Sequence, residues 1–274
     1  GGIISSAVAM IGSFFIVKEI SYKIRFSKEY AKQILSFGKW ILISTTIYFL
    51  SMNFDRLYLA RSLPFQILGI YGVARSLADV LSLLVARIGS LVIFPMVAAA
   101  GHSEAILRSK LSRSRSGMLL GTAVFLSLFV AAADLVVFLL YDDRYKAAAL
   151  MLPILSLGVW FSILCTISES VLLGIGRPSY GAIANLIKLV WLVIGLPVGV
   201  IYFGVAGAIG AMASADLVKY LPLLRAQRVE HIAFFRQDIL ITLALCAMIV
   251  VWRTLFWSVG LSGGLESLWG LDRL

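Results

Sequence analysis

The sequence predicts an all-α integral membrane protein, a polytopic bundle of transmembrane helices. Of its 274 residues, 61% are hydrophobic and only 14% are charged, and the mean hydropathy is +0.97. Soluble domains contain about 45–50% apolar and about 25% charged residues. The apolar residues come in blocks of about 20 between short charged loops, which matches the roughly 30 Å hydrocarbon core of a bilayer. These blocks are continuously apolar instead of alternating, so helices are predicted and a closed barrel of strands is not.

Hydropathy divides the chain into one partial and seven complete spans. They lie at 1–17, 34–60, 64–97, 117–140, 147–173, 181–202, 205–224 and 238–260. We expect the first to be the end of a truncated transmembrane helix, because the chain opens with Gly1-Gly2 and no initiator Met. The chain is therefore interpreted as a fragment.

The same pass predicts an organisation into six segments. These are the truncated helix at 1–17, a cytoplasmic basic linker at 18–33, a six-helix transmembrane bundle at 34–224, a cytoplasmic basic loop at 225–237, an additional transmembrane helix at 238–260 and a short tail at 261–274. Short Gly-rich stretches within the bundle, such as 204–214, allow helices to pack closely.

Basic residues in alternate loops predict the orientation. Thirteen Lys and Arg residues fall in the loops near 18–33, 101–116, 175–180 and 225–237, and five fall in the opposite set. The excess predicts that the first set is cytoplasmic and that the tight connections near 61–64, 141–146 and 203–204 lie outside.

Ionisable side chains inside the spans are the candidates for function, because each costs roughly 2.5–3.5 kcal/mol on insertion scales unless it meets a partner or water. Arg75 and Asp79 are four residues apart and share a helix face. They are either an ion pair that locks the bundle or part of a water-filled cavity that recognises an anionic group. Arg87 has no obvious partner on its own helix and is the better candidate for anion binding. Lys188 either reaches the headgroups or lines the same cavity.

Other charges near the ends of spans have simpler interpretations. Asp55 and Arg56 are adjacent and point in different directions, so each needs its own partner; they are a candidate outer gate or a helix-end anchor. Charges near helix ends are expected either to snorkel or to make a contact at the interface. This expectation covers Asp134, Glu169, Lys219 and Arg253.

Several classes of function have no support in the sequence. The net charge of +10 is explained by anionic lipid headgroups and topology, so no nucleic-acid partner is expected. Cys165 and Cys246 lie in apolar runs without metal-ligand spacing, and no catalytic motif was found. We therefore expect no catalytic residues, no metal and no cofactor.

The segment 37–95 resembles the oligosaccharide flippase family of the MOP transporter superfamily. The matching pieces are Phe37-Gly38, Asn53-Phe54-Asp55-Arg56, Leu68-Gly69-Ile70-Tyr71-Gly72-Val73-Ala74 and Phe94-Pro95, and 172–211 is similar to a helix pair of that family joined by a short Gly-Arg-Pro loop. The resemblance implies the second six-helix bundle of a flippase with flanking helices, in the bacterial inner membrane.

The function implied by this resemblance is transport without covalent chemistry. The substrate would be an undecaprenyl diphosphate-linked oligosaccharide moved across the inner membrane for lipopolysaccharide or exopolysaccharide biosynthesis, by alternating access with a cationic cavity. Arg75, Arg87 and Lys188 would contact the diphosphate and Asp79 would be an ion-pair or coupling group. Membrane lipids and a polysaccharide polymerase or export machinery are the expected partners. The alternative is a multidrug or cation-coupled antiporter of the same superfamily, although its cavity would be expected to be acidic.

Overall fold

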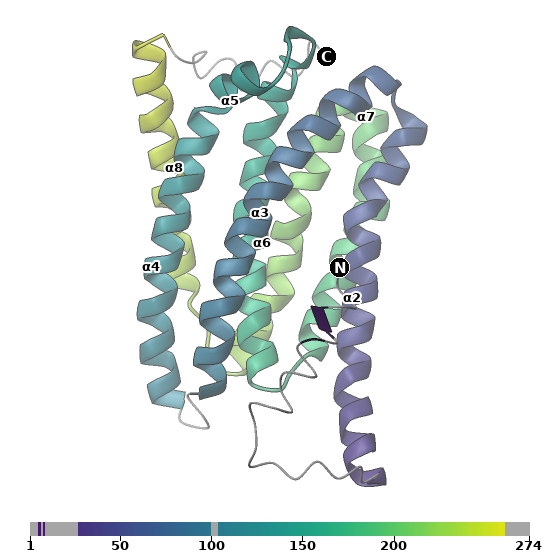
Figure 1. The fold of residues 1–274 in the computed structure, drawn as a ribbon, viewed down its shortest axis with the longest axis vertical. Coiled ribbons are helices and arrows are strands. Elements are labelled where there is room, and N and C mark those ends of the chain that lie inside the picture. Colours follow the sequence, from purple (N-terminus) through teal and green to yellow (C-terminus); the bar gives the residue numbers. More distant parts are fainter. Residues whose placement is uncertain (1–4, 7, 9–26, 100–103, 261–274) are drawn as a thin grey trace. The chain divides into compact units, whose positions relative to one another are not determined.

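The computed structural model describes residues 5, 6, 8, 27–99 and 104–260, although the side chains of 84–99, 104–111, 113, 114 and 143 lie outside the description. The described chain is helical and contains no strand (Figure 1). The elements are α2 (Lys28–Ser62), α3 (Phe65–Ala99), α4 (Glu104–Ala131), α5 (Ala133–Leu140), the short 3-10 helix η1 (Asp143–Tyr145), α6 (Ala148–Gly174), α7 (Ser179–Val229) and α8 (Phe235–Ser258). The predicted all-α polytopic membrane fold is confirmed.

The chain forms two compact units, residues 1–38 and 39–274. The boundary lies inside α2, whose first turns from Lys28 belong to the first unit. The second unit, which begins at Lys39, holds all the contacts described below.

Helix α6 is the central helix of the second unit. It packs against α3, α4, α5 and α7, and α4 packs along α8 (Figure 1). In its most apolar window 67% of the residues are buried, whereas the corresponding value for α2 is 6%. Trp160 of α6 is fully buried and donates a hydrogen bond from its indole Nε1 to Thr242 of α8 over 2.9 Å. The core is therefore built around α6, and α2 presents apolar side chains outward.

Helix α7 is a hairpin of two helices. As one straight helix its 51 residues would be about 77 Å long, far more than the roughly 30 Å of a hydrocarbon core. The backbone reverses at Gly204, where φ is 59° and ψ is −137°, a conformation that glycine adopts without strain. The halves then touch, since a Cβ added to Gly199 would lie 2.5 Å from the carbonyl oxygen of Gly207. The break falls between the predicted spans 181–202 and 205–224.

Three predicted segments compare with the structure in an informative way. The span predicted at 117–140 is broken between α4 and α5, which meet at an angle of 63°. Helix also extends into the basic segments at 18–33 and 225–237, because α2 begins at Lys28 and α7 continues to Val229. A helix satisfies its own backbone hydrogen bonds, so it continues past the apolar stretch into basic sequence. Most of 1–17 and all of 261–274 lie outside the described residues.

The described helices include several that are long and apolar enough to cross a membrane. Four qualify singly, namely α2, α6, α7 and α8, and the bent pair α4–α5 is a fifth if it counts as one span. The hairpin α7 counts once in this set although it contains two predicted spans. The protein is therefore a multi-pass membrane protein.

Candidate functional site

The two halves of α7 carry a buried ion pair between them. Lys188 lies on the first half and Asp216 on the second, and the Lys188 Nζ is 2.7 Å from the Asp216 Oδ1. Their side chains are 6% and 13% exposed. The hairpin at Gly204 sets this register, because the chain reverses and brings residues 28 positions apart to the same level. Lys188 therefore does not extend to the headgroups but holds a carboxylate inside the bundle.

A second ion pair lies beside the first and joins α7 to α6. The Lys219 Nζ is 3.0 Å from the Glu169 Oε1 and 3.1 Å from its Oε2, and the lysine side chain is 3% exposed. The same ammonium lies 5.4 Å from the centre of the Tyr48 ring, a cation–π contact. The Sγ of Cys165 donates to the backbone oxygen of Asp216 over 3.3 Å. Lys219 and Glu169 therefore pair with one another within the bundle.

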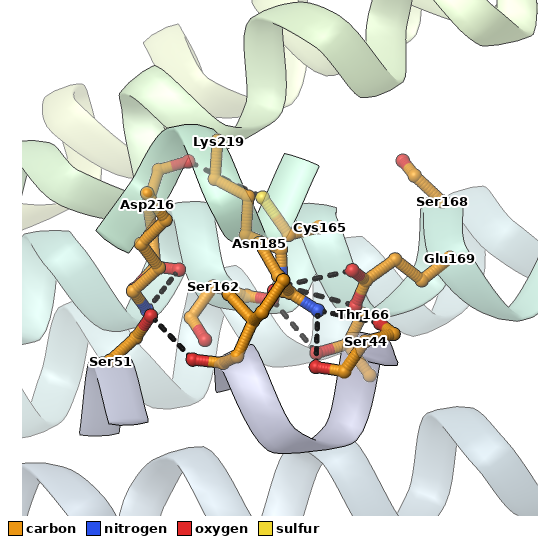
Figure 2. A network of polar contacts seen from close by, with 12 residues as sticks. Ser44, Ser51, Ser162, Cys165, Thr166, Ser168, Glu169, Asn185, Asp216 and Lys219 are labelled. Atoms are coloured by element: carbon orange, nitrogen blue, oxygen red, sulfur yellow. Dashed lines mark hydrogen bonds and ion pairs between the residues drawn. The ribbon is translucent and has the colours of Figure 1, made fainter. Parts of the chain in front are cut away.

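Helix α2 joins this cluster through an amide. The Asn185 Nδ2 donates to the Ser44 Oγ over 2.9 Å, which links α7 to α2. Figure 2 shows labelled polar side chains of α2, α6 and α7 meeting at this place. We call the set the inner polar network. Its members are Ser44, Tyr48, Cys165, Glu169, Asn185, Lys188, Asp216 and Lys219.

A separate charge cluster joins α2 to α3. The Arg75 Nε lies 3.0 Å from the Asp79 Oδ1, the pair expected from their i, i+4 spacing, and 3.9 Å from the Asp55 Oδ2. The Arg56 Nη2 lies 3.0 Å from the Asp79 Oδ2. Asp55 is buried and accepts a hydrogen bond from the Tyr71 hydroxyl over 2.6 Å. Asp55 and Arg56 thus turn to different partners, and Asp79 is shared by two arginines.

A small polar cavity separates the α2–α3 charge cluster from the inner polar network. Its volume is about 30 Å3, roughly that of one water molecule. Its wall includes Arg75, Asp79 and Asp216, together with the hydroxyl-bearing Ser82 and Ser162. The two sets of charges therefore face one another across a space that water could bridge.

The predicted anion-binding residues have different surroundings in the structure. Arg75 and Lys188 are each paired with a carboxylate, so an anion that reached them would have to displace Asp79 or Asp216. Arg87 is part of α3, but its side chain lies outside the described residues. The charges that were expected to form a mainly cationic cavity occur, where described, as balanced pairs.

Helix α8 is held at both ends by ion pairs that the sequence did not reveal. Arg115 of α4 is fully buried and its Nη1 lies 2.5 Å from the Asp238 Oδ1 of α8. Asp238 also accepts a hydrogen bond from the Tyr220 hydroxyl. At the other end of α8, the Arg253 Nη2 lies 2.8 Å from the Asp134 Oδ2 of α5. Asp134 and Arg253 therefore pair with one another, which joins α5 to α8.

The sequence alone gives no signal for the pair between Arg115 and Asp238. Local hydropathy places both residues at a predicted membrane boundary. Their separation of 123 positions gives no helical periodicity that could link them. Only the packing of α4 along α8 brings them together.

A larger cavity opens beside the inner polar network, between α2, α6 and the start of α7. Its volume is about 240 Å3. The polar part of its wall comprises Ser44, Thr45, Thr166, Glu169, Ser170 and Arg177, and the apolar part includes Ile41, Leu172, Leu173 and Pro178. We call it the inner cavity. Glu169 belongs both to its wall and to the inner polar network.

The chemistry available at these sites is that of charge and hydrogen bonding. Among the residues that the structure describes, no group of three or more His, Cys, Asp or Glu side chains is placed to hold a metal ion. The five pairs of the inner polar network and the α2–α3 charge cluster involve four acids and four bases, so a change of partner would leave the net charge unaltered. Such an arrangement suits binding and conformational exchange.

Comparison with known proteins places the chain in context. A family described as "Polysaccharide biosynthesis protein" matches residues 1–150, which is more than half of the chain. No curated protein and no solved structure matches.

Proposed function

Because the chain belongs to the polysaccharide biosynthesis protein family, we propose that it is a flippase which moves an undecaprenyl diphosphate-linked oligosaccharide across the bacterial inner membrane. Family membership supports a role in polysaccharide synthesis or export. The multi-pass helical fold supports the membrane as the place where that role is carried out. To these two statements the proposal adds the identity of the cargo, its movement across the membrane and the absence of covalent chemistry.

The observation that carries the proposal is the set of ion pairs inside the predicted membrane spans. Ionisable residues within spans are rare in membrane proteins and mark substrate or ion pathways. Here Arg75–Asp79 and Lys188–Asp216 flank one small polar cavity between α3, α6 and α7. A static bundle could be held by apolar packing alone, whereas a transporter needs polar groups that exchange partners between states.

In the proposed mechanism the cations hold the diphosphate after leaving their carboxylates. Arg75 and Lys188 bind the anion in one state and return to Asp79 and Asp216 in the other. Arg87 contributes a third cation from α3. The glycan crosses in a hydrated cavity and the lipid tail remains in the bilayer, so no bond is made or broken and the protein is not an enzyme.

Two further parts of the proposal concern the whole protein. The chain is the second six-helix bundle of a flippase of the MOP superfamily, and a first bundle supplies the other wall of the cavity. Membrane lipids surround it and a polysaccharide polymerase or export machinery receives the cargo. Asp55 and Arg56 form part of the outer gate, since Arg56 reaches Asp79 across the α2–α3 charge cluster.

The test is polysaccharide export in a flippase-deleted bacterium complemented with the protein as its gene encodes it. Wild type is expected to restore export, and Lys188→Gln or Arg87→Ala to reduce it at least tenfold at equal membrane abundance. The matched control is Arg144→Gln, whose side chain is 83% exposed in a short loop. Failure of wild type in several glycan backgrounds would overturn the proposal.

One observation favours a second candidate function, a cation-coupled multidrug antiporter. The ion pairs of the inner polar network and the α2–α3 charge cluster contain as many acids as bases, and a transporter of cationic cargo needs buried carboxylates. Under this alternative the protein lowers the accumulation of a cationic dye in cells and Asp216→Asn abolishes that effect. Under the flippase proposal, neither the wild-type protein nor the Asp216→Asn variant changes the accumulation of the dye.

A further inference from the structure

We propose that the inner cavity is a subsite for one sugar ring of the cargo, a proposal that rests on the flippase function above. The cavity lies between α2, α6 and the start of α7, and its volume is about 240 Å3. Pockets for drug-sized molecules begin at about 300 Å3, so this cavity suits a single ring and not an oligosaccharide.

The hydroxyl groups in the wall are arranged as hydrogen-bond acceptors. Thr45 donates its hydroxyl proton to the Ile41 carbonyl over 2.8 Å, Thr166 to the Ser162 carbonyl over 2.9 Å and Ser170 to the Thr166 carbonyl over 2.8 Å. With its proton committed to the helix backbone, each oxygen keeps lone pairs for a ligand. A ligand rich in O–H donors matches this wall.

The charged groups in the wall add one strong acceptor and one strong donor. Glu169 presents a carboxylate that is 26% exposed and is held by the buried ammonium of Lys219 at 3.0 Å. Because Lys219 neutralises and orients it, the carboxylate accepts hydrogen bonds without remaining an isolated charge. Arg177, 62% exposed at the same cavity, supplies donors to ring or hydroxyl oxygens or to a nearby phosphate.

The rest of the wall is apolar and completes the match to a sugar. Ile41, Leu172, Leu173 and Pro178 line the cavity together with the polar groups. A sugar ring has hydroxyls around its rim and C–H groups on its faces, so it meets both kinds of surface. An alkyl chain would leave the acceptors unpaired, and burying unpaired polar groups costs about 1–3 kcal/mol each.

The position of the cavity agrees with loading from the cytoplasmic side. Arg177 and Pro178 belong to the 175–180 connection, which the distribution of basic residues predicts to be cytoplasmic. A sugar bound there touches Glu169, and Glu169 holds Lys219 in the inner polar network. Occupancy of the subsite is thereby coupled to the ion pairs that the transport proposal uses.

The first experiment compares the export of two lipid-linked glycans that differ in the sugar next to the diphosphate. The double variant T166V/S170A removes two acceptors without changing side-chain shape greatly. It is expected to change the export ratio of the two glycans at least fivefold while membrane abundance and thermal midpoint stay as in wild type. An unchanged ratio would overturn the subsite.

The chain offers matched controls for this experiment. Thr254 and Ser258 are also four residues apart, are exposed on α8 and donate to backbone carbonyls, so T254V/S258A should leave the ratio unchanged. Gly181→Leu places a side chain into the inner cavity, where an added Cβ would be 3.5 Å from the Glu169 Oε1. It should lower export of both glycans at least fivefold, and Gly121→Leu, with no atom near its added Cβ, should not.

A second experiment keeps the subsite testable if the transport proposal fails. Ser170→Cys is made in the full chain with Cys246→Ser, purified in detergent and labelled with a maleimide in the presence of free hexoses or N-acetylhexosamines. At least a threefold slowing of labelling supports the subsite even without export. Equal rates with and without sugar, or the same slowing at a Ser258→Cys control, overturn it.

Discussion

The Lys188–Asp216 pair is the residue-scale feature on which both the fold and the proposed mechanism depend. Removing one partner of a buried ion pair leaves an uncompensated charge, which costs about 3–5 kcal/mol, whereas replacing both with apolar residues is often close to neutral. The pair is short and its ammonium is 6% exposed. Its two members should therefore behave as a unit.

We expect Lys188→Met to lower the free energy of unfolding by about 3 kcal/mol, because Asp216 then remains buried without a partner. The double variant K188M/D216L should recover to within about 1 kcal/mol of wild type. Unfolding in mixed detergent micelles measures both. Arg144→Met in the exposed Arg144–Asp142 pair is the control and should change stability little. Equal losses in the single and double variants would contradict the coupling.

Pairing could be predicted from the sequence only where partners share a helix. Arg75 and Asp79 are four residues apart, and the structure forms the ion pair that this spacing allows. Lys188 and Asp216 are 28 residues apart, and their meeting depends on the register of the hairpin at Gly204. Counting deep charges without their partners made the site look cationic, although each described cation of the network has a carboxylate beside it.

At the scale of elements, the glycines of α7 set how closely its two halves approach. Gly199 and Gly207 are in backbone contact across the hairpin, and further from the turn Trp191 donates to the Ala211 carbonyl over 3.0 Å. Gly158 brings α6 to the second half, because a Cβ added there would lie 2.9 Å from the Ala213 Cα. Any larger residue at these positions has to push backbones apart.

Gly207→Ala is expected to destabilise the protein by about 1–3 kcal/mol, because its Cβ would overlap the Gly199 backbone. Gly210→Ala, three residues along the same helix, meets no atom within 4 Å and should be neutral or stabilising, since alanine favours a helix over glycine by about 1 kcal/mol. Thermal unfolding in detergent compares the two. The same loss in both variants would show that backbone contact is not the cause.

The ends of helices were predictable to within a few residues where hydropathy changes, and less so where it does not. The predicted span 147–173 coincides almost fully with α6. The bend between α4 and α5 lies at Ala132, in a run that is apolar from 128 to 140 except for Asp134, so averaged hydropathy carries no sign of it. Helix α8 was predicted as an addition to the bundle, and its two buried ion pairs with α4 and α5 could not be foreseen without the tertiary structure.

Arg115→Met is expected to loosen α8 by removing the partner of Asp238, with a loss of about 3 kcal/mol in unfolding free energy. Limited proteolysis of the 230–234 connection should be faster in this variant. Arg236→Met is the control. Arg236 lies in the first turn of α8, as Asp238 does, but it is exposed, so this variant should behave as wild type. Unchanged proteolysis in Arg115→Met would mean that apolar packing alone holds α8.

On the scale of the whole molecule, the surface of the second unit matches lipid over long stretches. Leu42, Phe49, Ile194, Ile201 and Leu243 are among the large apolar side chains that are exposed in the structure. In water such surfaces would drive association. In a bilayer they face acyl chains, while the lysines of the inner polar network are buried with their carboxylates inside the bundle.

The predicted orientation gives a whole-molecule test. The test uses a chain with Cys165→Ala and Cys246→Ser. In this chain the cysteine of Arg177→Cys should react with an impermeant thiol reagent only when the cytoplasmic face is accessible. The cysteine of Arg144→Cys should react from outside in intact cells, because the connection near 141–146 carries few basic residues. Both side chains are well exposed, which makes labelling efficient. The reverse pattern would invert the topology and place the inner cavity at the outer face.

The single-residue turn at Gly204 also bears on how the protein enters the membrane during synthesis. Helices joined by so short a connection have no loop to translocate separately, so they insert together as one hairpin. Lys188 and Asp216 then enter the bilayer in the same step, and each neutralises a charge that alone would oppose insertion by about 2.5–3.5 kcal/mol. The turn thus acts before folding is complete. Two helices whose single charges would each oppose insertion enter the bilayer together, with those charges neutralised.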